Sequence, residues 1–262
     1  MVNNLFEDHF HQLRSNINTE IFKKNFNDEG VCLIKNFIPS IFLEPLINQL
    51  LELKSSAYFN KLEGNAYLED VDDSLPFDHA KNIIDTTSLS VLAYDQIPKG
   101  NILKVIYHNQ EVTKFIESVV GKKSLYLYGC PFGAINVAYM DKDDSLRWHF
   151  DQSDFVVSVP LQDSEYGGDF EYVANIRSCE NQNYSEVASI LNGKRNGIKS
   201  LSASCGDLIL FQGKNTLHRV TTIYGKRPRI VALFGYSYDK GYQSSSYLKK
   251  IRYGRTKPYQ QQ

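Results

Sequence analysis

The spacing of apolar residues divides the chain into a helical first part and a strand-rich second part. Up to about residue 123, Leu, Ile, Val and Phe recur mostly every three or four positions, which is the period of an amphipathic helix. The run at 30–38 is instead mostly apolar and indicates a strand, which Pro39 ends before the next helix begins. The predicted helices lie at about 5–27, 41–56, 101–107 and 111–120.

Residues 57–88 interrupt this pattern, because they are polar and have no regular apolar period. A loop of this length in a compact protein is often functional, so we expect it to be able to cover a binding site. Asp70, Asp72 and Asp73 could bind Ca²⁺, but no glycine-centred calcium loop accompanies them. A solvated loop is the better interpretation.

From residue 124 onward, short apolar runs rich in Val, Ile, Phe and Tyr alternate with turn signals such as Gly129-Cys130-Pro131 and Gly167-Gly168. Evenly spaced short strands are typical of a barrel or jelly roll. The predicted strands lie at 124–128, 134–140, 155–161, 169–173, 200–203, 208–211, 217–222 and 230–236, with one short helix at 184–192.

Helices followed by strands, in a chain of 262 residues, predict one compact unit of the α+β class. We therefore expect a single domain over residues 1–262. Its parts are a mostly helical segment at 1–123, a jelly-roll core at 124–236 and a polar C-terminal tail at 237–262.

Composition excludes several classes of partner. The formal net charge is -1, so nothing indicates a nucleic acid or an anionic membrane as partner. No segment is long and apolar enough to span a bilayer, and the N-terminus has no basic region followed by an apolar run. The four cysteines form no Cys-x-x-Cys pair. These features predict a cytoplasmic protein with free thiols.

One short motif and one distant residue carry the candidate chemistry. His149 and Asp151 are two positions apart, and side chains two apart on a strand point to the same face. With His218 they form a set of two imidazoles and one carboxylate. Non-haem Fe(II) oxygenases hold iron with such a facial triad, which leaves coordination positions open for substrates.

Arg229 adds a second kind of site. It directly precedes the apolar run 230–234, and an arginine at the start of a buried strand needs an anion. Its planar fork suits a carboxylate in a bidentate pair. Arg227 could play this part instead, but beside Lys226 it fits a solvated turn better.

The order of His149, Asp151, His218 and Arg229 resembles that of the Fe(II)/2-oxoglutarate-dependent oxygenases. The resemblance implies a double-stranded β-helix, a cupin-like jelly roll, with N-terminal helices packed outside. It also implies that Fe(II) binds to the triad, that 2-oxoglutarate chelates the iron with its distal carboxylate on Arg229, and that O2 is the oxidant. In the prolyl-hydroxylase-like branch a tyrosine about ten residues before the first histidine helps to hold the cosubstrate, and Tyr139 occupies that place.

A closer resemblance rests on four segments: 148–158, 167–173, 175–178 and 253–256. They are similar to the free amino-acid radical halogenases and their hydroxylating relatives. This implies a small free amino acid or similar metabolite as substrate, oxidised at an unactivated C–H bond. The halogenases carry Gly or Ala where this chain has Asp151, so we expect a hydroxylase.

Substrate contacts are less defined by the sequence. Gln152 and Asp154 flank the metal motif, and Gln152 ranks first because it adjoins Asp151. Asn136, Glu171 and Arg219 are further options. Each of these could equally be an ordinary surface or turn residue.

Other functions stay open at this point. On the same scaffold they are a radical halogenase, another oxidative outcome, or a protein-directed hydroxylase of the prolyl-hydroxylase kind. Outside it they are a metal-dependent cupin-like enzyme without 2-oxoglutarate, a zinc hydrolase, and a binding module that kept only the barrel. The absence of a second carboxylate as base opposes the hydrolase, and a complete triad with an arginine opposes the binding module.

Overall fold

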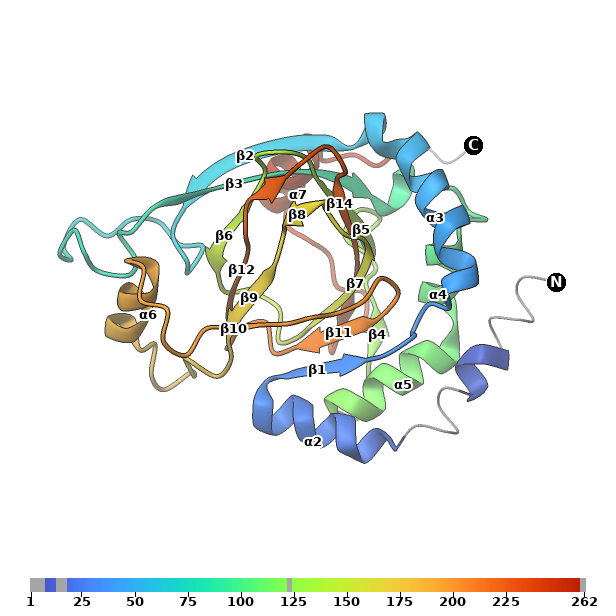
Figure 1. Ribbon diagram of the computed structural model, residues 1–262, viewed down its shortest axis with the longest axis horizontal. Coiled ribbons are helices and arrows are strands. Elements are labelled where there is room, and N and C mark those ends of the chain that lie inside the picture. The colour runs from blue at the N-terminus through green and yellow to red at the C-terminus, as the bar shows by residue number, and fades with distance from the viewer. Residues whose placement is uncertain (1–7, 13–17, 122–123, 260–262) are drawn as a thin grey trace.

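The computed structural model describes residues 8–12, 18–121 and 124–259. Two antiparallel sheets face each other and enclose the interior of a barrel, seen end-on in Figure 1. The large sheet runs in the order β1 (Val31–Ile34), β11 (Leu208–Phe211), β7 (Val156–Gln162), β14 (Arg229–Phe234), β5 (Ile135–Met140), β3 (Asp85–Ala93) and β2 (Tyr58–Gly64). The small sheet runs in the order β10 (Lys199–Ser200), β9 (Phe170–Val173), β12 (Leu217–Val220) and β6 (Leu146–His149).

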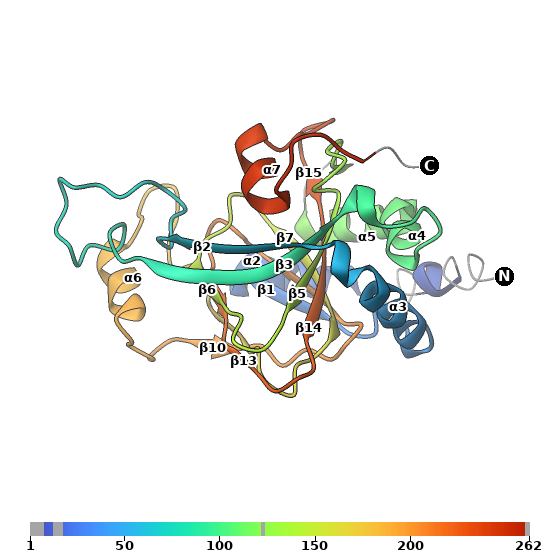
Figure 2. The same ribbon diagram turned by 90° about the horizontal axis from the view of Figure 1, so that it is seen from above.

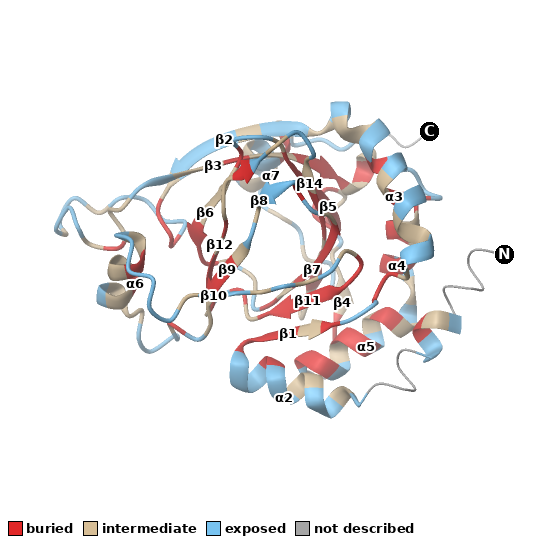
Figure 3. Cartoon of the chain, in the orientation of Figure 1, coloured by how far each residue is buried: buried red, intermediate tan, exposed pale blue. Residues whose placement is uncertain are grey.

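Four helices pack on the outer face of the large sheet (Figures 1 and 2): α2 (Thr19–Glu29), α3 (Ser40–Leu53), α4 (Ile102–His108) and α5 (Gln110–Val120). Their ends follow ordinary capping chemistry. The Asn109 side chain accepts hydrogen bonds from the first turn of α5, and Gly121 ends that helix with a positive φ of 72°. The inward faces of these helices are buried and their outer faces are exposed, as Figure 3 shows.

Alternation along β5 separates the core from the barrel interior. Val137 and Tyr139 belong to the apolar core between the large sheet and the helices. Asn136, Ala138 and Met140 point the other way and line a cavity between the two sheets. Because successive side chains of a strand point to opposite faces, one strand closes the core and also shapes the site.

Two pairs of very short strands complete the barrel: β8 (Tyr166–Gly167) with β13 (Ile223–Tyr224), and β4 (Tyr126–Leu127) with β15 (Tyr236–Ser237). The helix α6 (Tyr184–Leu191) lies beside the small sheet, next to the connection between β2 and β3 (Figure 1). The last helix, α7 (Ser246–Tyr253), covers one end of the barrel (Figure 2). Within the described residues, no helix has the length and apolar character needed to cross a membrane.

Several sequence expectations are corrected. The segment 57–88 is not one loop, because its ends form β2 and β3 and only the part between them, 65–84, is irregular. Polar side chains on the exposed edge strand β2 hid its strand character. The strand β6 went unpredicted, and the tail beyond 237 contains α7. The expected helical stretch 5–27 falls partly outside the described residues, and within them it includes α2 and a short helical turn at 8–12.

Candidate active site

The small sheet brings the three predicted metal ligands together. His149 ends β6, His218 lies on β12, and the two residues face each other in the register of these strands. Asp151 follows β6 by two residues. Its Oδ1 lies 3.8 Å from Nε2 of His149 and its Oδ2 lies 3.3 Å from Nε2 of His218. One ligand atom of each residue fits within 4.8 Å of the other two, which is the spacing of a single metal site.

Backbone carbonyls orient both imidazoles toward this site. Nδ1 of His149 lies 2.8 Å from the carbonyl oxygen of Arg147, and Nδ1 of His218 lies 3.1 Å from that of Thr216. A carbonyl can only accept, so each Nδ1 carries the proton and each Nε2 presents its lone pair. Burial, together with the neighbouring His218, lowers the pKa of His149 to about 3. A neutral imidazole is the form that binds a metal, so the donor set fits Fe(II).

Two turns hold Asp151 in place. Its backbone N–H donates to the carbonyl of Gly213 (3.1 Å), in the turn that leads into β12. The preceding residue, Phe150, donates its N–H to the carbonyl of Ala66 (2.8 Å), in the β2–β3 connection. At Gly213 a Cβ would come within 2.7 Å of the carbonyl oxygen of Ser153, so this close approach requires glycine.

The triad opens into a cavity of about 270 Å³ between the two sheets, which we call the inner cavity. Its walls are mostly apolar, with contributions from β3, β5, β7 and β14. Besides the triad, its charged residues are Arg147, Arg229 and Arg252. Asp151 is therefore the one carboxylate among the described residues that line it.

Arg229 lies at the start of β14 and borders both the inner cavity and a cavity of about 230 Å³ next to Gly168. Among the described residues, none accepts a hydrogen bond from its guanidinium. Burial lowers the pKa of Arg229 to about 10, against the opposing effect of Asp163, so it remains charged at neutral pH. Arg227, in contrast, donates to the carbonyls of Asp163 and Ser164 and is exposed.

The predicted substrate contacts lie farther out. Gln152 and Asp154 are exposed and line a second cavity of about 700 Å³, the outer cavity, at the α7 end of the barrel. Asp154 is paired there with Lys214 at 2.8 Å. Asn136 lines both cavities, and its Oδ1 accepts a hydrogen bond from the Tyr253 hydroxyl at 2.6 Å.

Tyr139 does not reach the site, which corrects its expected contact with the cosubstrate. It lies on the core face of β5, is fully buried, and donates from its hydroxyl to the carbonyl of Leu50 at 2.7 Å. The expectation rested on the distance in sequence between Tyr139 and His149. Because side chains alternate along β5, Tyr139 points into the core and away from the metal site. Glu171, another candidate substrate contact, is already engaged in ion pairs with Arg195 and Arg219.

Sequence reasoning missed Arg147 and Arg252. Both line the inner and the outer cavity. A signal for Arg147 was present, since it precedes His149 by two positions and so shares its strand face. Arg252 lies on α7, and no local pattern connects that helix to the triad.

Comparison with known proteins gives a consistent result. The Halogenase D family model matches residues 76–250, more than half of the chain. No match is found among curated proteins. A 2OG-Fe(II) oxygenase family oxidoreductase from Burkholderia pseudomallei is 13% identical with a TM-score of 0.53, covering 84% of this chain and 91% of that one.

Two further solved structures are similar. The α-ketoglutarate-dependent epimerase SnoN of nogalamycin biosynthesis has a TM-score of 0.57 and 12% identity, covering 84% of this chain and 82% of its own. HygX from Streptomyces hygroscopicus, solved with nickel, 2-oxoglutarate and hygromycin B, has a TM-score of 0.53 and 16% identity, covering 81% and 84%. These likenesses confirm the expected α+β fold with a double-stranded β-helix core.

The family match and the His149, Asp151 and His218 set agree on cofactor chemistry, namely Fe(II) with 2-oxoglutarate. The expectation drawn from the order of these residues is thereby confirmed. The chain belongs to the Halogenase D family and is an Fe(II)/2-oxoglutarate-dependent oxygenase.

Proposed function

We propose that this oxygenase hydroxylates an unactivated C–H bond of a small free amino acid or similar metabolite. The observation that carries the proposed outcome is the position of Asp151. Its two carboxylate oxygens lie 3.8 Å and 3.3 Å from the imidazole nitrogens of the two histidines. A carboxylate there fills the third protein position on the metal, which a halide would otherwise need.

Each polar group of the inner cavity then has a distinct part. His149, Asp151 and His218 hold Fe(II), and the bound metal with 2-oxoglutarate and O2 supplies the oxidising chemistry. Arg229 donates two parallel N–H hydrogen bonds to the distal carboxylate of 2-oxoglutarate, which is supported by a guanidinium that no described residue engages. Apolar side chains around it, among them Met140 and Val231, keep water away from this pair.

The cavity dimensions support a small substrate. The inner cavity holds about 270 Å³ and continues into the outer cavity of about 700 Å³ at the α7 end. Leu62 and Leu68 border both, so β2 and the β2–β3 connection partly cover the route to the triad. Gln152, Asp154 and Asn136 would meet the polar end of a substrate that extends into the outer cavity.

We also propose that residues 1–262 act as one domain. Strands from the N-terminal part, β1, β2 and β3, belong to the same sheet as those of the core. At the other end of the chain, Arg255 pairs with the buried Asp95 through two contacts of 2.7 Å.

The test is a screen of purified protein with Fe(II), 2-oxoglutarate, O2 and each of the L-amino acids, analysed by mass spectrometry. One amino acid should gain a single oxygen atom, with succinate formed one for one. Excess chloride should leave the product unchanged. A chlorinated main product would refute the hydroxylase assignment, whereas 2-oxoglutarate turnover that needs a protein substrate would refute the amino-acid assignment.

A further inference from the structure

Arg147 is a cation of the inner cavity that forms no salt bridge with a described residue, and Asp85 acts on it electrostatically only from beyond ion-pair distance. Its Nη1 donates to Oγ1 of Thr87 (3.0 Å) and to the carbonyl of Leu62 (3.4 Å), and both acceptors are uncharged. Its Nε is buried without a hydrogen-bond partner. Among the described residues, no carboxylate lies within ion-pair distance of this guanidinium. A buried N–H donor on a half-buried cation is unfavourable without an acceptor, and a bound anion would supply one.

The surrounding strands make room for this guanidinium and fix its direction. At Gly64, the last residue of β2, a Cβ would lie only 2.7 Å from Nη2 of Arg147. Thr87 on β3 and Leu62 on β2 engage Nη1. No described residue accepts a hydrogen bond from Nε or Nη2, and these two adjacent N–H groups form the planar fork that matches a carboxylate.

The charges of the loaded site lead to the same conclusion. The divalent metal and Arg229 carry three positive charges, which Asp151 and the 2-oxoglutarate dianion balance. Within the described part of the chain, Arg147 and Arg252 then have no carboxylate at ion-pair distance, and the charge of Asp85 reaches Arg147 only from farther away. Arg252 is exposed on α7, so water screens it, whereas Arg147 is half-buried and shares the strand face of His149. The uncompensated charge thus lies on the substrate side of the cavity.

We propose that Arg147 binds the carboxylate of the substrate through its Nε and Nη2, with Arg252 attracting the same anion at the cavity opening. This rests on the proposed function and narrows it. The substrate carries a carboxylate, and its aliphatic carbons lie against the apolar walls near the triad. Leu248 and Ile251 of α7 form part of these walls.

The test compares carboxylates with their amides, since an α-carboxamide keeps the size of the acid and removes its charge. Protein loaded with Mn(II) and 2-oxoglutarate is titrated calorimetrically, without oxygen, with each L-amino acid and its α-carboxamide. The matched alkyl carboxylates and alkyl amides serve as probes without an amino group. The variants are Arg147→Met, which removes the charge, and Arg147→Lys, which keeps the charge but loses the fork.

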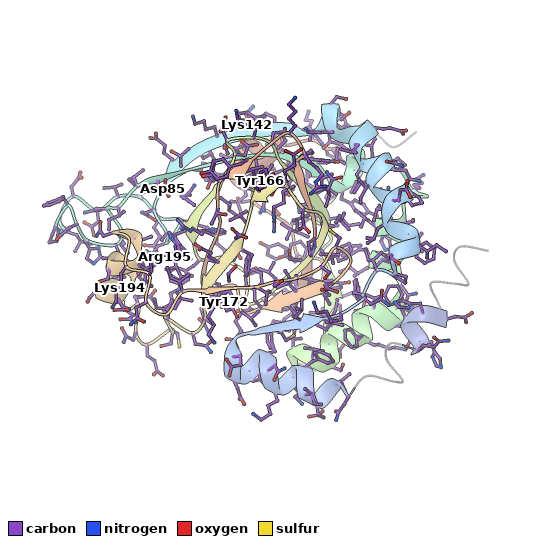
Figure 4. The ribbon with its side chains drawn as sticks, in the orientation of Figure 1. Asp85, Lys142, Tyr166, Tyr172, Lys194 and Arg195 are labelled. Atoms are coloured by element: carbon purple, nitrogen blue, oxygen red, sulfur yellow. The ribbon has the colours of Figure 1, made fainter. Side chains whose placement is uncertain are left out.

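Lys142→Met is the matched control, because it removes one positive charge five residues from Arg147. Lys142 is exposed on the outside of the barrel (Figure 4). Melting temperature and the dissociation constant for 2-oxoglutarate are recorded for every variant, to show that the fold and the cosubstrate site are intact.

Wild-type protein and Lys142→Met should bind at least one acid tenfold or more tighter than its amide, since a charge-assisted pair in a buried site is lost. Arg147→Met should bind the acid and the amide equally weakly. The preference of Arg147→Lys for the acid should lie between those of wild type and Arg147→Met. Absent or equal binding of acids and amides by loaded wild-type protein would overturn the proposal, as would an unchanged preference in Arg147→Met. Failure of 2-oxoglutarate itself to bind would instead refute the proposed function.

Discussion

At the scale of single residues, Arg229 and Arg227 provide a direct comparison. They are two positions apart, but only Arg229 lines the inner cavity, whereas Arg227 donates to backbone carbonyls at the surface. We expect Arg229→Met to weaken 2-oxoglutarate binding by about 2–5 kcal/mol, because the distal carboxylate loses its partner in a dry site. Calorimetric titration of the Mn(II) protein measures this. Arg227→Met should bind 2-oxoglutarate like wild type. If Arg227→Met weakened this binding and Arg229→Met did not, Arg227 would be the residue that pairs with the distal carboxylate.

Asp207 makes a second prediction, on stability. Its carboxylate accepts hydrogen bonds from Lys35 and from the backbone N–H groups of Asn36 and Ser204, which joins the connection between β1 and α3 to the turn before β11. Burial alone would raise the pKa of Asp207, but these donors outweigh it and lower the pKa below its usual value. The stabilisation is therefore complete above the unfolded-state pKa and is lost as the pH falls through the lower native value.

Asp207→Asn should accordingly lower the free energy of unfolding at pH 7 by about 1–3 kcal/mol. The difference in unfolding free energy between Asp207→Asn and wild type should become smaller as the pH drops below about 4. Urea unfolding across this range checks both statements. Asp28→Asn, which removes an exposed helix pair with Lys24, should leave stability close to that of wild type. A difference in unfolding free energy between Asp207→Asn and wild type that does not change with pH would contradict the assigned cause.

At the scale of elements, Arg177 joins the segment between His149 and Asp151 to the turn that leads into β12. Its guanidinium lies 3.8 Å from the ring centroid of Phe150, and its Nε donates to the carbonyl of Lys214 at 2.5 Å. Phe150 separates His149 from Asp151, and Lys214 lies in the turn that precedes β12. Arg177 is thus a positioning residue that acts through these turns on the spacing of the triad.

Arg177→Met should weaken Fe(II) binding about tenfold or more, in line with other residues that orient metal ligands. Arg177→Lys should recover part of this loss by restoring the cation over the ring. Anaerobic titration with Fe(II) is the measurement. Arg195→Met serves as control, because Arg195 lies near α6 (Figure 4) and, among the described residues, its guanidinium pairs with Glu171 and not with Phe150 or Lys214. Equal losses in both variants would indicate a general structural effect.

At the scale of the whole molecule, the C-terminal segment completes the cavities. α7 contributes Leu248, Ile251 and Arg252 to both of them. The chain after this helix is fastened by Arg255, which pairs with Asp95, a residue that is 8% exposed. The amide of Tyr259 donates to the same carboxylate at 2.7 Å.

Arg255→Met should therefore weaken binding of the proposed amino-acid substrate several-fold while Fe(II) and 2-oxoglutarate bind as in wild type. The reason is that α7 loses its anchor, whereas the triad and Arg229 lie on other elements. Titrations of each ligand separate these effects. Lys257→Met, an exposed change in the same segment, should leave all three affinities unaltered. Loss of metal binding in Arg255→Met would mean that the anchor supports the barrel itself.

Local sequence determined much of this architecture. The helix period predicted α3, α4 and α5, and apolar runs between turn signals predicted β5, β7, β11 and β14, because these patterns are set by which face each element buries. The triad was also readable, since a metal needs His149, Asp151 and His218 as residue types whatever surrounds them. The pairing of β6 with β12 then explains why His149 and His218, 69 positions apart, lie side by side.

The direction in which a side chain points, and its contacts with distant parts of the chain, depended on the tertiary structure. Alternation along β5 turned Tyr139 into the core and left Asn136 facing the cavity, which spacing from the motif cannot reveal. The edge strand β2 and the helix α7 have polar sequences because one side of each meets solvent, so neither gave a clear apolar period. Arg147 became a binding candidate only when Gly64, Thr87 and Leu62 were seen to surround it, because its unpaired state depends on side chains from other strands.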